Sequence, residues 1–390
     1  MRLAILSTHP IQYYAPIFRL LAQQEGLESK VFYGWKGATE RVHDPGFGAA
    51  IAWDIPLLGG YEHEFVPNVA RNPGTNHLRG IDLPELTARI TAWQPDALLV
   101  FGWAWKAHLA ALRHFKGRMP ILFRGDSTLL DERPGLRTMA RRLWLRWVYS
   151  HVATALYVGT RNREYYEAHG LKPAQLVFAP HAIENERFMQ DSGGLEAKAE
   201  AWRVSVGISP EQVVFLFAGK LEPKKAPEFL LKTFSQLRGS GPGLPVLVFC
   251  GSGLLEPALR QAAGPGVHFL GFRNQSEMPW VYRAGDVLVL PSRGPGETWG
   301  LALNEAMACG RAVVASDHVG AAVDLVQQGR TGWIFAADNA ASLTSVLRDA
   351  LAQGRSGLRV MGQQAIQHIS SWSPARQVEG IIQGVKSSRL

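Results

Sequence analysis

Short apolar runs alternate with amphipathic helical segments along the whole chain, and this alternation limits the fold more than any other feature. Helical spacing fills several gaps between the runs, as in Ala15–Gln24, Trp103–Phe115 and Asn162–His169. Strands that alternate with helices form mostly parallel sheets covered by helices on both faces. We therefore expect an α/β protein of two doubly wound, Rossmann-like domains. The predicted strands are Leu3–Leu6, Ser29–Tyr33, Ala97–Phe101, Ile121–Phe123, Ala155–Val158, Leu176–Phe178, Val213–Phe217, Val246–Phe249, Val267–Leu270, Val287–Leu290, Ala312–Ala315 and Trp333–Phe335.

The length of 390 residues suits two domains that each bury a core of their own. The polar stretch 184–198 is the best linker, so we predict one domain over 1–185 and another over 186–371. Residues 35–80 break the alternation and are rich in Gly, Pro, Asn, His and aromatic residues. Long irregular insertions of this kind are often functional, and we predict that this one helps to recognise an acceptor.

A loop and a short helix follow the apolar run Val287–Leu290. Residues 291–296 are rich in Pro and Gly, and the apolar spacing from Leu301 fits a helix that Gly310 would end. The start of such a helix offers free N–H groups and the positive end of a dipole to an anion such as phosphate. The residues that lead into this helix are Thr298, Trp299, Gly300 and Leu301.

Two glutamates bracket this turn, with seven residues between them. Glu297 precedes the turn, and Glu305 lies about one turn into the predicted helix. Both carboxylates are therefore predicted near the anion site, where they can accept hydrogen bonds from hydroxyl groups. Isolated glutamates are commonly solvated surface residues, but the unbroken pattern that continues through Asp317 favours a site.

A second motif, from Phe217 to Lys225, follows the predicted strand Val213–Phe217. Gly219 ends the strand, and the loop carries Lys220 and Lys225. Ligands of doubly wound sheets bind at the carboxyl ends of the strands, so both ammonium groups are predicted to face that ligand. A lysine pair alone is often only a solvated basic loop. Together with the two glutamates it indicates a site for an anionic, hydroxyl-bearing ligand.

These two motifs resemble those of the family 4 retaining glycosyltransferases (group 1 glycosyltransferases), which have the GT-B fold. The resemblance implies two domains that face each other across a cleft. It also implies that Lys220 and Lys225 hold the diphosphate of a nucleotide sugar, that Glu297 contacts the sugar and that Glu305 contacts the ribose. Arg273, after the strand Val267–Leu270, is implied beside the base or a phosphate. The family often has arginine at the position of Lys220. Here the compact ammonium of a lysine replaces the bidentate guanidinium of that arginine.

The leaving diphosphate needs positive charge as the glycosidic bond breaks. Many other transferases supply it with a metal ion held by an Asp-x-Asp pair, which this sequence lacks, as it also lacks a His/Cys cluster with metal-ligand spacing. We expect two lysines and a helix N-terminus to take that role, with no metal and no cofactor besides the nucleotide sugar.

The first domain carries weaker signals. His9 and Gln12 lie on the loop after the first predicted strand, where many relatives have a Gly-Gly pair. Arg124 and Asp126 follow the strand Ile121–Phe123, near the position of a histidine in many relatives. We predict that Asp126 orients or deprotonates an acceptor hydroxyl and that Arg124 binds an acceptor phosphate. An Arg–Asp ion pair that fixes the loop is the plainer alternative, as a loop position satisfied by backbone groups is for His9.

The net charge of +8 suits anionic ligands or surfaces. The basic residues belong to no nucleic-acid-binding module that we recognise, so no nucleic acid partner is expected. The segment 133–149 gathers arginines beside a helical face formed by Leu136, Ala140, Leu143 and Trp147. It is interpreted as an amphipathic helix on an anionic membrane or as an ordinary surface helix, and both remain open. Its arginines are Arg133, Arg137, Arg141, Arg142 and Arg146.

The remaining features concern location and the end of the chain. Cys250 and Cys309 lie in apolar contexts and are interpreted as core residues, which favours the cytoplasm. No apolar run has the length needed to span a bilayer, and the apolar segment at the start of the sequence is too short for a signal peptide. We therefore expect a cytoplasmic protein, or one bound peripherally to the inner face of the membrane. The resemblance implies that 372–390 form a helix that returns to the first domain.

The predicted function is transfer of a sugar from a nucleoside-diphosphate sugar to a hydroxyl of a saccharide or lipid-linked acceptor. Retention of the anomeric configuration, and a place in cell-surface polysaccharide or glycolipid biosynthesis, are implied by the resemblance. Two alternatives stay open. A UDP-sugar 2-epimerase of the same architecture would release UDP without an acceptor, and a non-catalytic nucleotide-sugar-binding subunit would bind without turnover.

Overall fold

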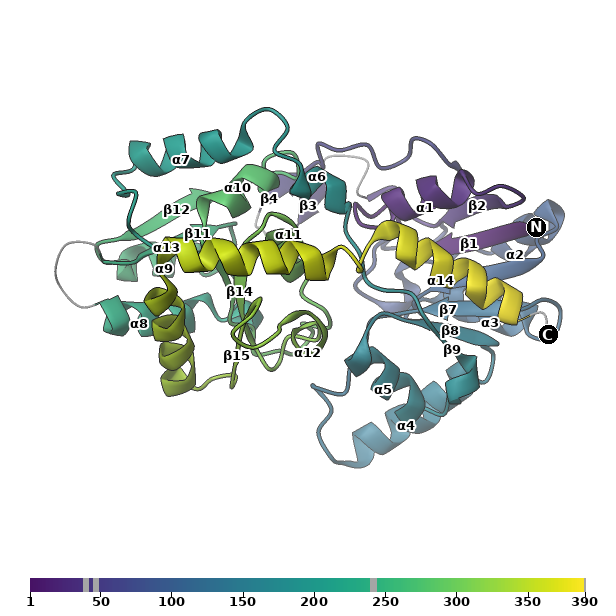
Figure 1. The fold of residues 1–390 in the computed structure, drawn as a ribbon. Coiled ribbons are helices and arrows are strands. Elements are labelled where there is room, and N and C mark those ends of the chain that lie inside the picture. The colour runs from purple at the N-terminus through teal and green to yellow at the C-terminus, as the bar shows by residue number, and fades with distance from the viewer. Residues whose placement is uncertain (38–41, 45–48, 239–243, 389–390) are drawn as a thin grey trace. The chain divides into compact units, whose positions relative to one another are not determined.

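The computed structural model describes residues 1–37, 42–44, 49–238 and 244–388 and divides into two compact units (Figure 1). The first unit comprises Met1–Val42, Ile55–His181 and Pro374–Leu390. The second comprises His43–Asp54 and Ala182–Ser373. Each unit is built on a parallel sheet of its own, as the sequence predicts.

The sheet of the first unit has seven strands in the order β5-β2-β1-β6-β7-β8-β9, and every neighbouring pair is parallel. Successive residues alternate between its two faces, so Leu3 and Ile5 pack in one apolar cluster, whereas Ala4 and Leu6 pack in the other. Burial on both faces explains why these strands read as continuous apolar runs. Their bounds are β1 (Arg2–Ser7), β2 (Glu28–Tyr33), β5 (Glu62–Phe65), β6 (Ala97–Phe101), β7 (Ile121–Arg124), β8 (Thr154–Tyr157) and β9 (Leu176–Phe178).

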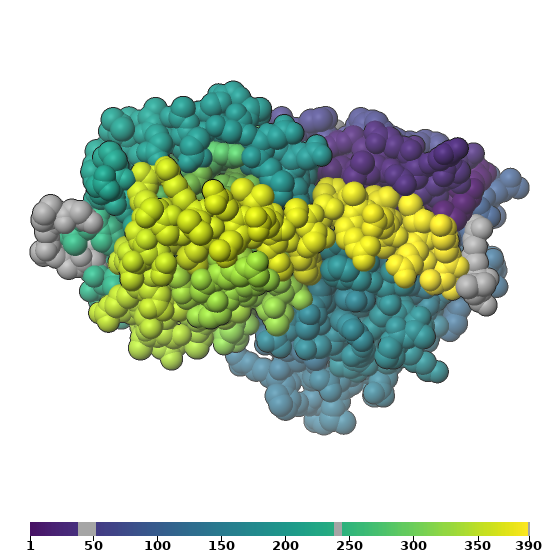
Figure 2. All heavy atoms as spheres, in the orientation of Figure 1, coloured from purple at the N-terminus to yellow at the C-terminus, as the bar shows by residue number. Residues whose placement is uncertain are grey.

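Helices cover both faces of this sheet. The first and last helices of the chain, α1 and α14, pack on one face and lie against each other (Figures 1 and 2). The other helices contribute to the cluster on the opposite face. The helices are α1 (Ala15–Ala22), α2 (Leu86–Trp93), α3 (Lys106–Phe115), α4 (Leu136–Tyr149), α5 (Thr160–Ala168) and α14 (Pro374–Ser387), with short 3-10 turns η2 (Leu78–Gly80) and η3 (Pro173–Gln175).

The sheet of the second unit has six parallel strands in the order β12-β11-β10-β13-β14-β15. Its strands are β10 (Val214–Ala218), β11 (Val246–Cys250), β12 (Val267–Gly271), β13 (Val287–Leu290), β14 (Ala312–Ser316) and β15 (Gly332–Phe335). Its helices are α6 (Asn185–Met189), α7 (Leu195–Ser205), α8 (Pro227–Arg238), α9 (Glu256–Ala262), α10 (Met278–Ala284), α11 (Ala302–Ala308), α12 (Ala322–Leu325) and α13 (Ala340–Ile369), and η4 (Pro223–Lys225) is a 3-10 turn. Side chains of β10, β11 and β13 share one apolar cluster with those of α8 and α13.

Both sheets reverse their strand order between the first and fourth strands, which are β1 and β6 in one sheet and β10 and β13 in the other. At such a reversal the loops after the two central strands diverge to opposite faces, and a ligand can enter between them. The topology therefore marks one place at the carboxyl edge of each sheet for a site.

Every strand predicted from the sequence is present, with ends shifted by at most a residue or two. The prediction missed β5, because its sequence Glu-His-Glu-Phe is mostly polar at the edge of the sheet. It also missed the short strands β3 (Val42–Asp44) and β4 (Ala49–Ile51), which pair with each other. None of the helices in the described parts of the chain combines the length and the apolar character that crossing a bilayer would require.

The compact units do not coincide with the predicted domains, since their main boundaries fall after His181 and Ser373 and residues 43–54 group with the second unit. There Asn274 Nδ2 donates to the carbonyl of Ala52 at 2.7 Å, and the backbone N–H of Ser276 donates to Asp54 Oδ1 at 3.0 Å. The predicted insertion 35–80 is thus divided between the units. Its residues 38–41 and 45–48 lie outside the described residues.

Candidate functional site

The strand reversal of the second sheet brings the two predicted motifs together. β10 and β13 are neighbours, with Phe215 opposite Val287 in the register. The loop after β10 runs from Gly219 to Lys225, and the loop after β13 from 291 to 301. The backbone N–H of Arg293 donates to the carbonyl of Lys224 at 3.0 Å, which fastens one loop to the other.

An ion pair joins these loops at their side chains. The ammonium of Lys225 contacts Glu297 Oε2, and the hydroxyl of Ser292 donates to the same oxygen at 2.8 Å. Glu297 is buried, and the Lys225 side chain is mostly covered. A buried carboxylate with two donors holds the ammonium at a fixed place at the sheet edge. Ser292 was missed by sequence reasoning, because a serine in a Pro/Gly-rich loop carries no signal of its own.

The neighbouring lysines have different surroundings. Lys224 pairs with Glu222 of its own turn at 3.3 Å, and its side chain is 40% exposed. Lys220 is half-buried and follows Gly219 at the end of β10. Of the lysines on this turn, the structure therefore pairs Lys225 with the predicted Glu297 across the strand reversal.

Glycines keep the carboxyl ends of β10 and β11 close together. The N–H of Gly219 donates to the carbonyl of Cys250 at 2.9 Å. Gly251 has φ +133°, and a Cβ there would overlap the carbonyl oxygen of Gly219. Only glycine fits such a position, so no side chain covers this part of the sheet edge.

The loop before α11 is held tightly by its neighbours. Trp299 is buried, and its indole N–H donates to Asn304 Oδ1 at 2.9 Å. Gly300 has φ +97°, and a Cβ there would lie 2.7 Å from Val319 Cγ1. Thr298 is half-buried, and Leu301 is the N-cap residue of α11. The N–H of Leu303 donates to the carbonyl of Gly300 at 2.9 Å, where the hydrogen bonding of the helix begins.

Glu305 lies in the first turn of α11 and is buried. The hydroxyl of Tyr282, on α10, donates to its Oε2 at 2.6 Å and so fixes the orientation of the carboxylate. Tyr282 was not predicted, because only the packing of α10 against α11 brings it near.

Arg273 lies directly after β12 and contacts its own turn. Its Nε donates to the carbonyl of Leu270 at 3.1 Å, and its Nη1 pairs with Glu277 at 3.2 Å. Part of its charge is therefore balanced within the protein.

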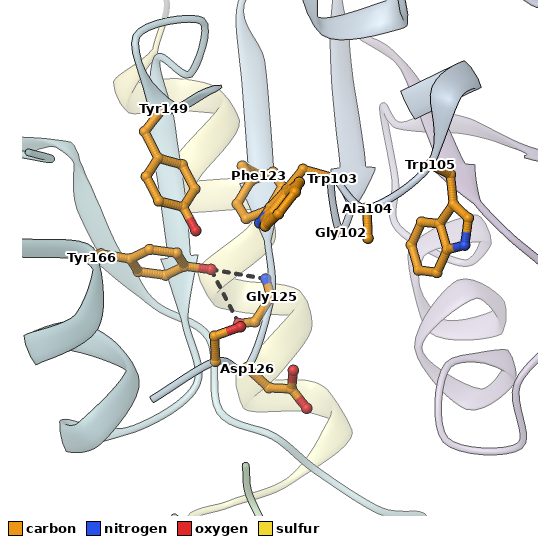
Figure 3. A pocket seen from close by; sticks show the side chains of 10 residues that line it. Gly102, Trp103, Ala104, Trp105, Phe123, Gly125, Asp126, Tyr149 and Tyr166 are labelled. Atoms are coloured by element: carbon orange, nitrogen blue, oxygen red, sulfur yellow. Dashed lines mark hydrogen bonds between the residues drawn. The ribbon is translucent and has the colours of Figure 1, made fainter. Parts of the chain in front are cut away.

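The first unit holds a cavity of about 160 Å³ at the carboxyl ends of β6 and β7 (Figure 3). The Tyr166 hydroxyl accepts from the N–H of Gly125 at 2.8 Å and donates to its carbonyl at 3.1 Å. Burial raises the pKa of Tyr166, so the phenol stays protonated. Half of the lining residues are aromatic, and the wall consists of Gly102, Trp103, Ala104, Trp105, Phe123, Gly125, Asp126, Ser127, Tyr149 and Tyr166.

The two charged residues predicted here have different surroundings. Asp126 lines the cavity, whereas Arg124 is buried and is not among the lining residues. The guanidinium of Arg124 donates to the carbonyls of Ala179 at 2.6 Å and Pro180 at 3.1 Å. Burial lowers its pKa. Arg124 therefore ties β7 to the segment after β9, which is not the phosphate contact that we expected of it.

His9 and Gln12 follow β1, as predicted. The Thr8 hydroxyl lies 2.9 Å from His9 Nδ1, and the His9 ring meets Trp35 edge-on with ring centroids 5.4 Å apart. Burial lowers the pKa of His9 to about 4, so the ring is neutral near pH 7. Gln12 is half-buried on the same loop.

Residues 212–353 match the model of the family "Glycosyl transferases group 1". Two curated relatives, the D-inositol 3-phosphate glycosyltransferases of Rhodococcus erythropolis and Nocardia farcinica, are 29% and 33% identical over 199 residues. Each alignment covers 48% of this chain, and it covers 44% and 43% of the respective relative. The chain thus spans less than half the length of these curated relatives.

The whole chain resembles solved structures in fold, among them the glycosyltransferase WaaG, which superposes with a TM-score of 0.67 at 18% identity and covers 97% of this chain and 98% of its own. HepE of Anabaena, crystallised with UDP, superposes with a TM-score of 0.73 at 17% identity and covers 99% of this chain and 100% of its own. Another structure of the same protein holds UDP-glucose and superposes with a TM-score of 0.71. The fold is that of GT-B glycosyltransferases, and the predicted resemblance to the group 1 family is confirmed, with the family match lying in the second unit.

Proposed function

We propose that this protein transfers a sugar from a nucleoside-diphosphate sugar to a hydroxyl acceptor, with retention of the anomeric configuration. The observation that carries the proposal is the Lys225–Glu297 pair, which lies at the strand reversal of the second sheet. Both residues fall within the segment that matches the group 1 family. The names of the relatives support glycosyl transfer as the reaction.

In the proposed reaction, the bond between the anomeric carbon and the diphosphate oxygen breaks, and its electron pair stays with the diphosphate. The acceptor oxygen bonds to the anomeric carbon and gives up its proton. Lys220 and Lys225 stabilise the charge that develops on the leaving diphosphate. Glu297 holds Lys225 in place before the donor arrives and accepts hydrogen bonds from the sugar hydroxyls.

The rest of the donor site follows from the same edge of the sheet. Glu305, oriented by Tyr282, accepts from the ribose hydroxyls in this proposal. The backbone from Thr298 to Leu301 supplies N–H donors to the diphosphate. The open backbone at Gly219 leaves space for that contact, and Arg273 borders the base.

We assign the acceptor to the cavity of the first unit. A cavity of about 160 Å³ has room for a six-membered ring such as that of one sugar, since an engineered cavity of about 150 Å³ binds benzene. Aromatic walls suit the apolar faces of such a ring, and the carboxylate of Asp126 suits its hydroxyls. Asp126 would orient or deprotonate the attacking hydroxyl. A saccharide or lipid-linked saccharide used in cell-surface polysaccharide or glycolipid synthesis fits this description.

Thermal unfolding with UDP, GDP, ADP and CMP tests the donor site. A ligand at about one hundred times its dissociation constant adds roughly 2.7 kcal/mol to the free energy of unfolding. We expect one nucleoside diphosphate, with UDP the first to test, to raise the melting temperature of the wild type and of Lys224→Ala but not of Lys225→Ala. An equal shift in both variants would contradict the assignment of Lys225.

Turnover is tested separately with the sugar conjugate of the nucleotide that binds. Release of nucleoside diphosphate that depends on an added acceptor supports transfer, and release without any acceptor would support an epimerase instead. Binding without release under any condition would support a non-catalytic subunit. Addition of a chelator should leave the rate unchanged, because the proposal assigns the charge on the diphosphate to lysines rather than to a metal ion.

A further inference from the structure

Helix α4 exposes a stripe of large apolar side chains. Leu136, Met139 and Leu143 are 83%, 62% and 67% exposed, and Trp144 and Trp147 are 42% and 40% exposed. Across the residues that the structure describes, these five make up nearly half of the exposed large apolar side chains. Single exposed apolar residues are ordinary, but five within about three turns of one helix form a contiguous apolar patch whose exposure to water is unfavourable.

The opposite face of α4 fixes this orientation. Leu145, Val148 and Tyr149 are buried in the apolar cluster of the first unit. α4 lies beside α5 (Figure 1), and Arg141 Nη2 donates to the hydroxyl of Tyr165 on α5 at 3.1 Å. The helix is therefore anchored by one face, and its apolar stripe cannot turn inward without giving up these contacts.

Positive charge borders the stripe. Arg141 and Arg142 both pair with Glu132, at 3.2 and 3.0 Å. Arg133, Arg137 and Arg146 are exposed, and within the described part of the chain no ion pair balances any of the three. An apolar stripe edged by unbalanced arginines has the character of a helix that lies in the boundary between lipid headgroups and acyl chains.

We propose that α4 docks this protein on an anionic lipid bilayer. The apolar side chains enter the boundary region, and the arginines extend to the lipid phosphates. A second copy of the chain is a poorer occupant, because pairing two such helices would bring like charges together. The proposal does not depend on glycosyl transfer. It would, however, hold the cavity of the first unit near the headgroups, since Tyr149 at the end of α4 lines that cavity.

Co-sedimentation of the full chain with vesicles tests the proposal. One set of vesicles is phosphatidylcholine alone, and the other contains phosphatidylcholine and phosphatidylglycerol in equal parts. We expect binding to the anionic vesicles, weakened by salt, and an affinity loss of about tenfold or more in Leu136→Ser/Leu143→Ser and in Arg137→Gln/Arg146→Gln. Matched controls are Val204→Ser/Val360→Ser and Arg330→Gln/Arg348→Gln, which change exposed residues of the second unit and should bind as the wild type does.

Absence of binding to anionic vesicles at low salt would overturn the proposal, and so would equal losses in the α4 variants and their controls. Analytical ultracentrifugation without lipid tests the alternative occupant of the stripe, which is a second copy of the chain. A dimer that Leu136→Ser/Leu143→Ser disperses would assign the stripe to a second copy. Because all four changed positions on α4 are exposed, the variants should retain the wild-type melting temperature and nucleotide response, which separates a failure here from a failure of the donor-site proposal.

Discussion

The second unit places charged side chains at the carboxyl ends of β10 and β13, whereas the first unit places aromatic rings at the carboxyl ends of β6 and β7. The two sheets share one strand order, so topology sets where each site lies and the side chains set what it can bind. Fixed cations suit the diphosphate of the proposed donor. The aromatic cavity is suited to a neutral ring, and its charged neighbour Arg124 is turned to backbone carbonyls instead.

The largest effect that would test this contrast concerns Lys225. Lys225→Ala and Glu297→Gln should each lower kcat by about 10²–10³, because charge on the leaving diphosphate loses a fixed partner. Lys224→Ala is the matched control, since Lys224 pairs with Glu222 on the same turn. Steady-state kinetics with a sugar conjugate of the nucleotide identified by thermal unfolding measures the difference. Similar losses of kcat in Lys225→Ala and Lys224→Ala would indicate that the loop acts only as a general basic patch.

The next effect concerns the backbone that shapes the charged site. Gly251→Ala should lower the free energy of unfolding by about 3 kcal/mol or more, because the new Cβ would overlap the Gly219 carbonyl in a backbone region that side chains rarely adopt. Urea denaturation measures this loss. Gly264→Ala adds the same methyl group in open space and should be close to neutral. A tolerated Gly251→Ala would show that the two strand ends need not approach so closely.

A smaller effect is expected in the aromatic cavity. Tyr166→Phe removes the partner of the Gly125 N–H and carbonyl, which should cost roughly 1–3 kcal/mol of stability and raise the KM for acceptor more than it lowers kcat. Tyr157→Phe, at the end of β8 and outside the cavity, serves as the control. An unchanged acceptor KM in Tyr166→Phe would argue that the acceptor binds elsewhere.

Near neutral pH, the smallest effect is a pH dependence of the first unit. Burial lowers the pKa of His108 to about 4 and that of His181 to about 3, from 6.5. Both rings stay neutral in the folded chain. Below pH 6.5 the unfolded chain therefore binds more protons, and the free energy of unfolding decreases as the pH falls. Each histidine should contribute about 1 kcal/mol per pH unit as the pH falls from 6.5 to its folded pKa.

Hydrogen exchange of the α3 amides in urea, measured at several pH values, gives the slope of the free energy of unfolding against pH. His108→Gln keeps a donor for the Gly102 carbonyl but does not titrate, so its slope should be smaller than that of the wild type. The exposed His77→Gln is the control. A wild-type slope in His108→Gln would assign the acid sensitivity to other groups.

The sequence by itself determined most of the strands, the class of the fold and the two motif loops. Hydrophobic periodicity carries that information locally, since a buried parallel strand needs a run of apolar residues wherever it lies in the chain. The runs Val213–Phe217 and Val287–Leu290 predict their strands to within a residue, and the Pro/Gly-rich segment 291–296 predicts the loop. The apolar face of the segment 133–149 could likewise be predicted from its spacing.

Only the tertiary structure decided which partners meet. The motif singles out Lys225, but only the fold shows that Lys225 pairs with Glu297 whereas the adjacent Lys224 pairs with Glu222. Arg124 and Asp126 are two residues apart but have different surroundings, because Arg124 ends β7 and donates to the carbonyls of Ala179 and Pro180, whereas Asp126 lies beyond the strand and lines the cavity. The exposure of the α4 stripe and the grouping of residues 43–54 with the second unit also required the fold. Such pairings depend on contacts between segments far apart in the sequence, about which periodicity carries no information.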